Sequence, residues 1–200
     1  MTGDTEKKAV FFDRDGVLNR DTGYVHSMDE VQWIPGAREA AARLCRGGWL
    51  LFVVTNQSGV ARGFYTEHDV ETLHENMNRE LEKTGGHIEK FYYCPHLPGA
   101  PLPEYNRNCE CRKPKPGMIL QALSEYGISR DRAFLFGDSP RDVESAERAG
   151  IRGFLFTGSD LDLFIRQHLP DLEGRMNQPQ PQEGRFPRIL IIHISSLGDS

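Results

Sequence analysis

The sequence lacks the features of membrane-spanning, secreted and disulfide-rich proteins. No apolar run approaches the roughly 18 residues that a bilayer-spanning helix needs. The opening stretch, MTGDTEKKAV, has no apolar core of the kind found in secretory signals. Only four cysteines are present among 200 residues, and cysteines in such a chain are more often metal ligands or buried thiols than disulfides. We therefore expect a cytoplasmic protein with no membrane partner.

A surplus of positive charge is also missing. The 29 Asp and Glu residues outnumber the 24 Lys and Arg residues, which leaves a formal net charge of −5. Because nucleic-acid interfaces are built on clustered Lys and Arg, this balance argues against a nucleic-acid partner. It remains compatible with a small anionic substrate held by a few local cations.

What the sequence does contain is an alternation of short apolar segments with amphipathic ones. Continuous apolar segments typical of strands covered on both faces occur at 9–12, 49–55, 133–137 and 153–156. Apolar residues recur at helical spacing within 35–46, 66–81, 118–126 and 143–149. Thr66 and Asp69 resemble a capping box at one helix start. The alternation predicts an α/β fold, a three-layer Rossmann-like parallel sheet with helices on both faces.

The pattern divides the chain into three parts. Residues 1–169 are long enough for one domain with a sizeable core. Residues 170–187 include NQPQPQEG and are typical of a Pro/Gln-rich linker. Residues 188–200, RILIIHISSLGDS, begin a new strand-like run, which is either an added sheet strand or the start of another domain. We favour the second interpretation.

Carboxylates and a threonine lie at the ends of several predicted strands. In AVFFDRDGVLN, Asp13 and Asp15 follow the first strand, and Thr55 and Asp138 end two others. Ligands of parallel sheets bind outside the carboxyl ends of the strands, so these side chains should share one edge. Residues two apart on a strand face the same side, so Asp13 and Asp15 should converge. A divalent cation such as Mg²⁺ would relieve their repulsion, although a single such pair is more often a turn or helix cap.

Further groups suited to phosphoryl transfer accompany these carboxylates. Thr55 in VVTNQSG offers a hydroxyl and neighbouring backbone N–H groups to a phosphate. In CRKPKPGM, Lys113 offers a fixed positive charge and Arg112 a bidentate fork. FGDSPRD supplies Asp138 and Asp142. Each signal alone is weak, but together, in this order, they predict a phosphoryl-transfer site.

In these motifs, over roughly residues 9–160, the sequence resembles the haloacid dehalogenase superfamily of aspartate-nucleophile phosphatases. The resemblance implies that Asp13 attacks phosphorus and forms an aspartyl-phosphate. Asp15 would protonate the leaving alkoxide and then deprotonate water. Thr55 and Lys113 would hold the phosphoryl oxygens, and Mg²⁺ would be bound by Asp13, Asp138 and the backbone carbonyl of Asp15. The acid of the fourth motif, in the PRD segment, would either orient this group or lie at a helix N-terminus.

A second metal site is predicted from four ligands in a short window. They lie in YYCPHLPG and NCECRKP: Cys94, His96, Cys109 and Cys111. Three thiolates and one imidazole form a closed tetrahedral Zn²⁺ site of the structural kind. The alternative is incidental thiols such as Cys45, which is alone on an apolar helix face. Since Cys111 directly precedes Arg112 and Lys113, we expect zinc to order the entry of these two cations into the site without joining the reaction.

The zinc loop and the absence of a large cap insertion imply a capless member of the superfamily. Two groups of phosphatases are similar, those of heptose 1,7-bisphosphate and those of histidinol phosphate. FFDRDGVLNRDTGYVH and VVTNQSGVARG match the first group closely. The resemblance implies removal of the C7 phosphate of D-glycero-D-manno-heptose 1,7-bisphosphate in the synthesis of ADP-heptose for lipopolysaccharide core. Histidinol phosphate is the alternative substrate.

That resemblance also implies which residues touch the sugar phosphate. They are Asp21, Thr22, Gly23, Tyr24, Asn56, Gln57, Ser58 and Arg112. One departure is Ser139. The heptose-bisphosphate phosphatases carry a lysine at this position, and the loss of that positive charge affects how the second phosphate is held.

Two other functional classes are weighed against this interpretation. A DNA 3′-phosphatase shares the aspartate motifs but would need a basic face. A non-catalytic, zinc-stabilised binding module would not need the intact set of aspartates, threonine and lysine. Residues 188–200 resemble the opening strand and glycine loop of the ADP-heptose glycosyltransferases, which implies a fused heptosyltransferase-like domain. We expect the phosphatase to be a monomer.

Overall fold

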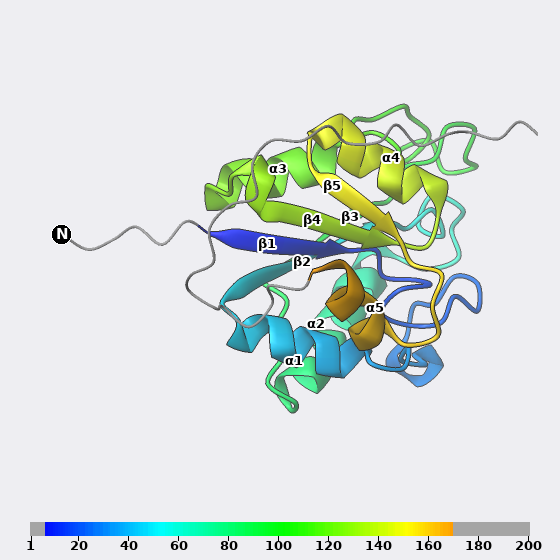
Figure 1. The fold of residues 1–200 in the computed structure, drawn as a ribbon. Helices are drawn as coiled ribbons and strands as arrows, with labels where there is room; N and C mark the ends of the chain where they lie inside the picture. Colours follow the sequence, from blue (N-terminus) through cyan, green and yellow to red (C-terminus); the bar gives the residue numbers. More distant parts are fainter. Residues whose placement is uncertain (1–6, 170–200) are drawn as a thin grey trace, which may run out of the picture.

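The computed structural model describes residues 7–169, which form a five-stranded sheet between two layers of helices (Figure 1). The strand order is β3-β2-β1-β4-β5, and every pairing is parallel. The strands are β1 (Lys8–Phe12), β2 (Trp49–Asn56), β3 (Lys90–Cys94), β4 (Ala133–Gly137) and β5 (Arg152–Leu155). The predicted fold class is confirmed, and no cap domain is inserted between these elements within 7–169.

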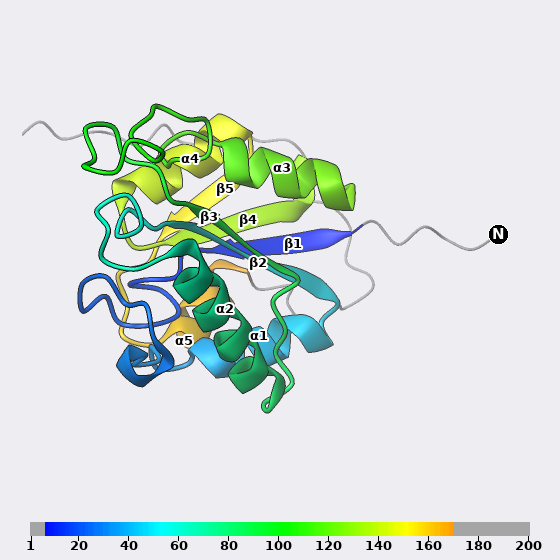
Figure 2. The same ribbon diagram turned by 180° about the vertical axis from the view of Figure 1, so that it is seen from behind.

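Helices cover both faces of the sheet, as Figures 1 and 2 show from opposite sides. On one face lie α1 (Ala37–Arg46), α2 (Glu67–Glu82) and α5 (Leu161–His168). On the other lie α3 (Gly117–Tyr126) and α4 (Pro140–Ala149). Two short 3-10 turns, Met28–Glu30 and Arg130–Arg132, complete the order. The predicted capping box is confirmed, because the Thr66 hydroxyl accepts a hydrogen bond from the Asp69 amide at the start of α2.

The central strand explains the continuous apolar pattern of the sequence. In β1, Val10 and Phe12 are fully buried in the core cluster that includes α1, α2 and α5. The alternate residues, Ala9 and Phe11, are equally buried against α3 and α4. Because both faces of the sheet are covered, both sets of side chains are apolar. This packing fixes the carboxyl end of β1 at the middle of one sheet edge.

Two elements, β3 and α5, were not predicted from the sequence. The edge strand β3 reads KFYYC, and its exposed Lys90 and half-buried Phe91 interrupt the apolar run. The helix α5 is short and has only three buried residues, Leu161, Asp162 and Ile165. Both were missed because each is half exposed and therefore lacks the pattern of a fully buried element.

Within the described residues, no helix combines the length and the apolar character needed to cross a bilayer. The predicted linker at 170–187 and the predicted domain start at 188–200 lie outside the described residues.

Candidate active site

A cavity of about 330 Å³ lies at the carboxyl ends of β1 and β2. Its lining consists of Asp13, Asp15, Asp21, Gly23, Tyr24, Thr55, Asn56, Gln57, Ser58, Tyr65, Lys113 and Arg141. The structure therefore brings together the predicted catalytic and substrate-contacting residues, with two exceptions. Thr22 is exposed and does not line the cavity. Arg112 is also outside it and donates a hydrogen bond to the backbone oxygen of His96, 3.2 Å away.

Asp13 is buried at the base of this cavity with one carboxylate oxygen occupied. Its Oδ1 accepts hydrogen bonds from the Arg14 amide at 2.8 Å and lies 2.9 Å from Lys113 Nζ. No hydrogen bond engages its Oδ2 among the described residues. Burial raises the pKa of Asp13, and the Lys113 charge opposes this shift. The free oxygen is the one able to approach a ligand.

Asp13 and Asp15 reach the same cavity, but not by the predicted strand alternation. The strand β1 ends at Phe12, and the chain turns at Gly16, whose φ is +88°. Leu18 and Asn19 donate backbone hydrogen bonds to the carbonyl of Arg14 and close this turn. The turn, rather than the pleat of a strand, therefore positions Asp15.

Lys113 connects three groups beneath the cavity. Its fully buried ammonium lies 2.9 Å from Asp13 and 2.8 Å from Asp142, and it donates to the Val54 carbonyl at 2.8 Å. Although burial alone would lower it, these two carboxylates raise the pKa of Lys113. The Asn56 side chain accepts from the Lys113 amide at 3.0 Å and donates to its carbonyl at 3.1 Å. The lysine is thus a fixed, fully paired charge.

Asp142 lies at the helix N-terminus considered for it and also pairs with Lys113. It lies at the third position of α4, where its Oδ2 accepts hydrogen bonds from the Ser139 amide at 3.0 Å and hydroxyl at 2.8 Å. Its Oδ1 pairs with Lys113. Although burial opposes it, the Lys113 charge and the Ser139 hydrogen bonds lower the pKa of Asp142. Asp142 therefore caps α4 with one carboxylate oxygen and orients Lys113 with the other.

The carboxylates of Asp13, Asp138 and Asp142 offer oxygen atoms that all lie within 4.8 Å of one another. Loss of hydration raises the pKa of Asp138 to about 6, with further contributions from Asp13 and Asp142. A Cβ on Gly16 would overlap the Asp138 carboxylate, so the turn leaves room for this acid only because it has a glycine there. Because Asp142 is already paired, Asp13 and Asp138 are the oxygen donors that fit Mg²⁺.

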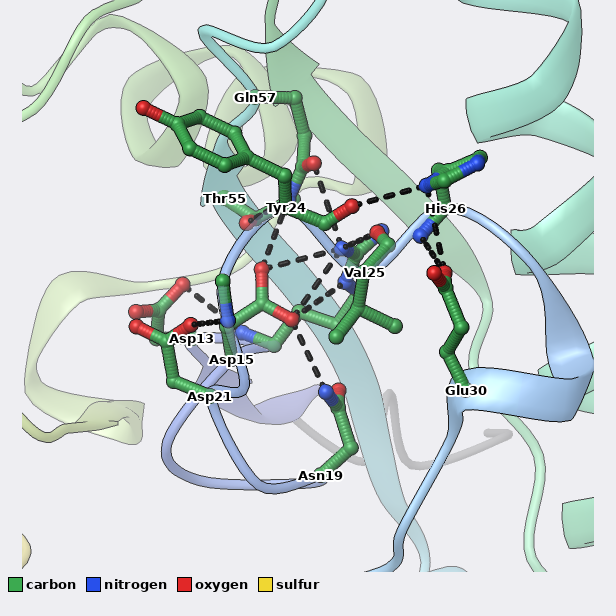
Figure 3. Close-up of polar contacts among 12 residues, drawn as sticks. Asp13, Asp15, Asn19, Asp21, Tyr24, Val25, His26, Glu30, Thr55 and Gln57 are labelled. Carbon is green, nitrogen blue, oxygen red and sulfur yellow. Dashed lines mark hydrogen bonds and ion pairs between the residues drawn. The ribbon is translucent and has the colours of Figure 1, made fainter. Parts of the chain in front are cut away.

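Asp15 is held by several side-chain donors, drawn in Figure 3. Arg14 lies 3.0 Å from it, Asn19 donates at 2.9 Å and Gln57 at 3.1 Å. Gln57 also donates to the Thr55 hydroxyl oxygen at 2.9 Å. Because that hydroxyl accepts from Gln57, its own hydrogen is available to donate into the cavity.

The loop of residues 21–24 forms one wall of the cavity. Asp21 accepts a hydrogen bond from the Gly23 amide at 3.0 Å, and Tyr24 has a left-handed φ of +55°. The exposed Tyr24 ring meets the exposed Phe64 ring edge to face, with 4.8 Å between centroids. These aromatic faces are suited to contact with the carbon skeleton of a sugar.

Sequence reasoning missed three residues of this region, Arg14, Tyr65 and Arg141. Arg141 could have been found, because the first turn of a helix that follows a strand faces the same sheet edge as the strand end. Arg14 and Tyr65 carry no such signal, since their positions depend on contacts made by distant parts of the chain.

The predicted zinc ligands form a separate cluster next to the end of β3. The Cys94 and Cys111 sulfur atoms are 3.0 Å apart, and Cys109 lies within 3.4 Å of both. His96 directs Nδ1 toward them, 3.4 Å from Cys111. The hydrogen bond between Cys94 and Cys111 lowers the pKa of Cys111 to about 5 and raises the pKa of Cys94, so one thiolate of the pair, the form that zinc requires, is favoured. Four convergent N and S donors fit a tetrahedral structural zinc ion.

The fold and the site together define a hydrolase of the haloacid dehalogenase type. In agreement with this class, the sequence profile of the HAD-hydrolase-like family matches residues 110–162. The D-glycero-beta-D-manno-heptose-1,7-bisphosphate 7-phosphatase of Rhodopseudomonas palustris is 42% identical over 174 residues, which cover 86% of this chain and 97% of that protein. The enzyme of the same name from Pasteurella multocida is 46% identical over 146 residues, covering 73% and 79% of the two chains. The chain therefore belongs to the family of these heptose-bisphosphate 7-phosphatases.

A solved structure supports the same relationship. The D,D-heptose 1,7-bisphosphate phosphatase of B. bronchiseptica, complexed with magnesium and phosphate, superposes with a TM-score of 0.69. It is 34% identical, and the match covers 80% of this chain and 86% of that one.

Proposed function

We propose that this protein hydrolyses the C7 phosphate of D-glycero-D-manno-heptose 1,7-bisphosphate, a step in the synthesis of ADP-heptose for lipopolysaccharide core. One observation supports this above all. Asp13 presents a free carboxylate oxygen into a cavity, beside Asp15 and the Asp138 carboxylate. The chain that carries it aligns with 97% of the length of a heptose-bisphosphate 7-phosphatase, at 42% identity. The names of these relatives specify the beta anomer, and we extend that preference to this protein.

The proposed reaction has two displacement steps at phosphorus. Asp13 Oδ2 attacks, the bond from phosphorus to the sugar oxygen breaks, and Asp15 gives its proton to that leaving oxygen. Asp15 then takes a proton from water, which attacks the aspartyl-phosphate and releases inorganic phosphate and Asp13. Bound Mg²⁺ supplies positive charge that screens the attacking carboxylate from the phosphate.

The other residues of the cavity hold the reacting phosphate. Thr55 donates its free hydroxyl hydrogen to a phosphoryl oxygen, and Ser58 and the loop of residues 21–24 contact the sugar. Lys113 neutralises the base of the cavity through Asp13 and Asp142, and it binds phosphate by exchanging one of its present acceptors. Asn56 acts through the backbone of Lys113.

We assign the second phosphate to Arg141. Ser139 caps α4 and carries no charge, Lys113 is paired, and Arg112 contacts the zinc loop. Arg141 lines the cavity, and within residues 7–169 no hydrogen bond or ion pair engages its guanidinium. A guanidinium binds phosphate oxygens bidentately, so Arg141 takes the place of the cation that is missing at Ser139.

A phosphate-release assay on heptose 1,7-bisphosphate, with and without Mg²⁺, tests this function. We expect Mg²⁺-dependent release of the C7 phosphate, much slower turnover of histidinol phosphate, and no turnover after Asp13→Asn. Normal activity of Asp13→Asn would refute the nucleophile. Faster turnover of histidinol phosphate would reassign the substrate, and inactivity toward every phosphate ester would leave a binding module.

The remaining assignments concern the chain as a whole. We propose that residues 1–169 are the phosphatase domain, 170–187 a linker and 188–200 the start of a heptosyltransferase-like domain. We also propose a monomer that acts in the cytoplasm on a small sugar phosphate, without a nucleic-acid partner. Sequencing the reading frame beyond Ser200 tests the fused domain, and sedimentation of the purified chain tests the monomer.

A further inference from the structure

Arg14 is a fully buried arginine next to the cavity, and its charge needs a partner. Its side chain is 0% exposed, and a buried guanidinium is tolerated only where its charge and its five N–H donors are matched. Among residues 7–169, Asp15 is the only carboxylate recorded in an ion pair with it, 3.0 Å away. The charge of Arg14 is therefore balanced by one carboxylate, which itself faces the cavity.

The remaining donors of Arg14 are fixed by groups from three other segments. Nη2 donates to the Val25 carbonyl at 2.6 Å and to Gln57 Oε1 at 3.2 Å. Nη1 lies 3.2 Å from Nε2 of His74, which is on α2. Figure 3 shows the Asp15 carboxylate between Asn19 and Gln57, facing this group of donors. Val25, Gln57 and His74 therefore hold the guanidinium in place in addition to its ion pair with Asp15.

The contact between Arg14 and His74 defines the state of the histidine. Because a guanidinium can only donate, Nε2 of His74 accepts, and its hydrogen is on Nδ1. Burial, followed by the Arg14 charge, lowers the pKa of His74 well below its usual value, which agrees with a neutral ring. Nδ1 is buried without a hydrogen-bond partner in the described structure.

An unpaired buried N–H destabilises a protein, so apolar packing does not explain a histidine here. The ring stacks on Phe91, with 4.5 Å between centroids, and a methionine or leucine could fill this place without an unpaired donor. What the histidine alone provides is an acceptor aimed at Arg14.

We propose that Arg14 and His74 are positioning residues for Asp15: His74 fixes the guanidinium, and the guanidinium fixes the carboxylate in the orientation that transfers protons. This rests on the proposed role of Asp15 as acid and base. Neither residue touches substrate. Their loss affects the steps in which Asp15 gives or takes a proton, while substrate binding is retained.

A matched pair of variants at position 74 tests the proposal. His74→Gln keeps an acceptor near the position of Nε2, whereas His74→Met has the same size and no comparable acceptor. We expect His74→Met to lower kcat/KM for heptose 1,7-bisphosphate by about tenfold, a part of the usual contribution of general acid catalysis. His74→Gln should restore most of it, and His68→Met, an exposed histidine of the same helix, should leave it unchanged.

The leaving group separates positioning from a general structural defect. The p-nitrophenolate of p-nitrophenyl phosphate departs without a proton, so His74→Met should lower kcat/KM for this ester much less than for the sugar phosphate. Equal losses on both esters, not relieved by His74→Gln, would overturn the proposal. If the wild-type protein prefers another alkyl phosphate, the proposed substrate is wrong, and that ester replaces the heptose substrate in the assay. The comparison of its loss with the loss on p-nitrophenyl phosphate still tests the positioning role.

Arg14→Lys is a second variant if His74→Met does not fold. It keeps the buried positive charge but cannot reach Asp15 and His74 together. We expect the same selective loss on the alkyl ester, and an equal loss on both esters would contradict the proposal here too.

Discussion

At the scale of single residues, Gly16 lets the turn that follows Asp13 and the loop that carries Asp138 share one small space. Its backbone is left-handed, and any Cβ there would overlap the Asp138 carboxylate. Conformation and close approach therefore both require glycine at this position.

We predict that Gly16→Ala weakens Mg²⁺ binding and lowers activity by at least about tenfold, because Asp138 must move away from Asp13. Gly85→Ala is the matched control, since Gly85 has a φ of +86° and open space around it. The strain alone costs about 1 kcal/mol in either variant. Activity titrated with Mg²⁺, beside thermal unfolding, measures both effects. Equal activity in the two variants would show that the overlap has no consequence.

Arg141 allows a prediction about substrate preference. Arg141→Gln should raise KM for heptose 1,7-bisphosphate by roughly tenfold, as expected for one charge-assisted contact that is partly solvated. It should change KM for a heptose 7-monophosphate little, because that ester lacks the second phosphate.

The exposed Arg148, on the same helix, provides the control variant Arg148→Gln. Steady-state kinetics on the two esters decide the matter. A similar rise in KM for both esters would assign Arg141 to the reacting phosphate instead.

At the scale of elements, the segment between β3 and α3 carries both the zinc ligands and the lysine. Cys94 ends β3, and Cys111 precedes Lys113 by two residues. Residues 95–116 contain no helix or strand, so the four-ligand cluster and the contacts of Lys113 with Asn56 and Val54 tie this segment to the sheet.

We predict that Cys109→Ser, or removal of zinc by a chelator followed by repletion with Mg²⁺, lowers activity about tenfold or more and speeds hydrogen exchange in 95–116. The reason is that a ligand set of three no longer closes the tetrahedral site. Cys45→Ser, which changes the thiol on α1, should leave both measurements unchanged. A zinc-free protein with full activity and an ordered segment would refute the role given to zinc.

Elements also show how far the sequence predicts the structure. β1, β2 and β4 are buried on both faces and are followed by aspartate or contain threonine, so their positions and their shared edge were predictable. The lysine could be placed by its motif alone. Its pairing with Asp142 could not, because it depends on where α4 starts relative to a segment some thirty residues earlier. The contacts of Arg14 with His74 and Gln57 could not be predicted either, because they form only when β1, β2 and α2 have packed together.

At the scale of the whole molecule, the acidic cluster couples cation binding to stability. Asp13, Asp138 and Asp142 repel one another, and a bound cation stabilises only the folded chain, where they meet. At 100 times its dissociation constant, a ligand adds about 2.7 kcal/mol.

For a domain of this size, that energy should raise the Tm by roughly 5–10 °C on addition of Mg²⁺. Asp138→Asn should abolish most of the rise, whereas the exposed Asp131→Asn should preserve it. Differential scanning calorimetry with and without Mg²⁺ measures the shift. An unchanged shift in Asp138→Asn would remove this carboxylate from the cation site.

The pairing of β1 with β4 joins residue 9 to residue 133, and this has a consequence for biosynthesis. During synthesis Asp13 leaves the ribosome early, whereas Asp138, which follows β4, and Asp142, which is on α4, leave it more than a hundred residues later. An unfinished polypeptide therefore carries Asp13 without the other carboxylates of the site. The site is complete only after β4 and the start of α4 have been made, so we expect chains that terminate before these elements to have no phosphatase activity.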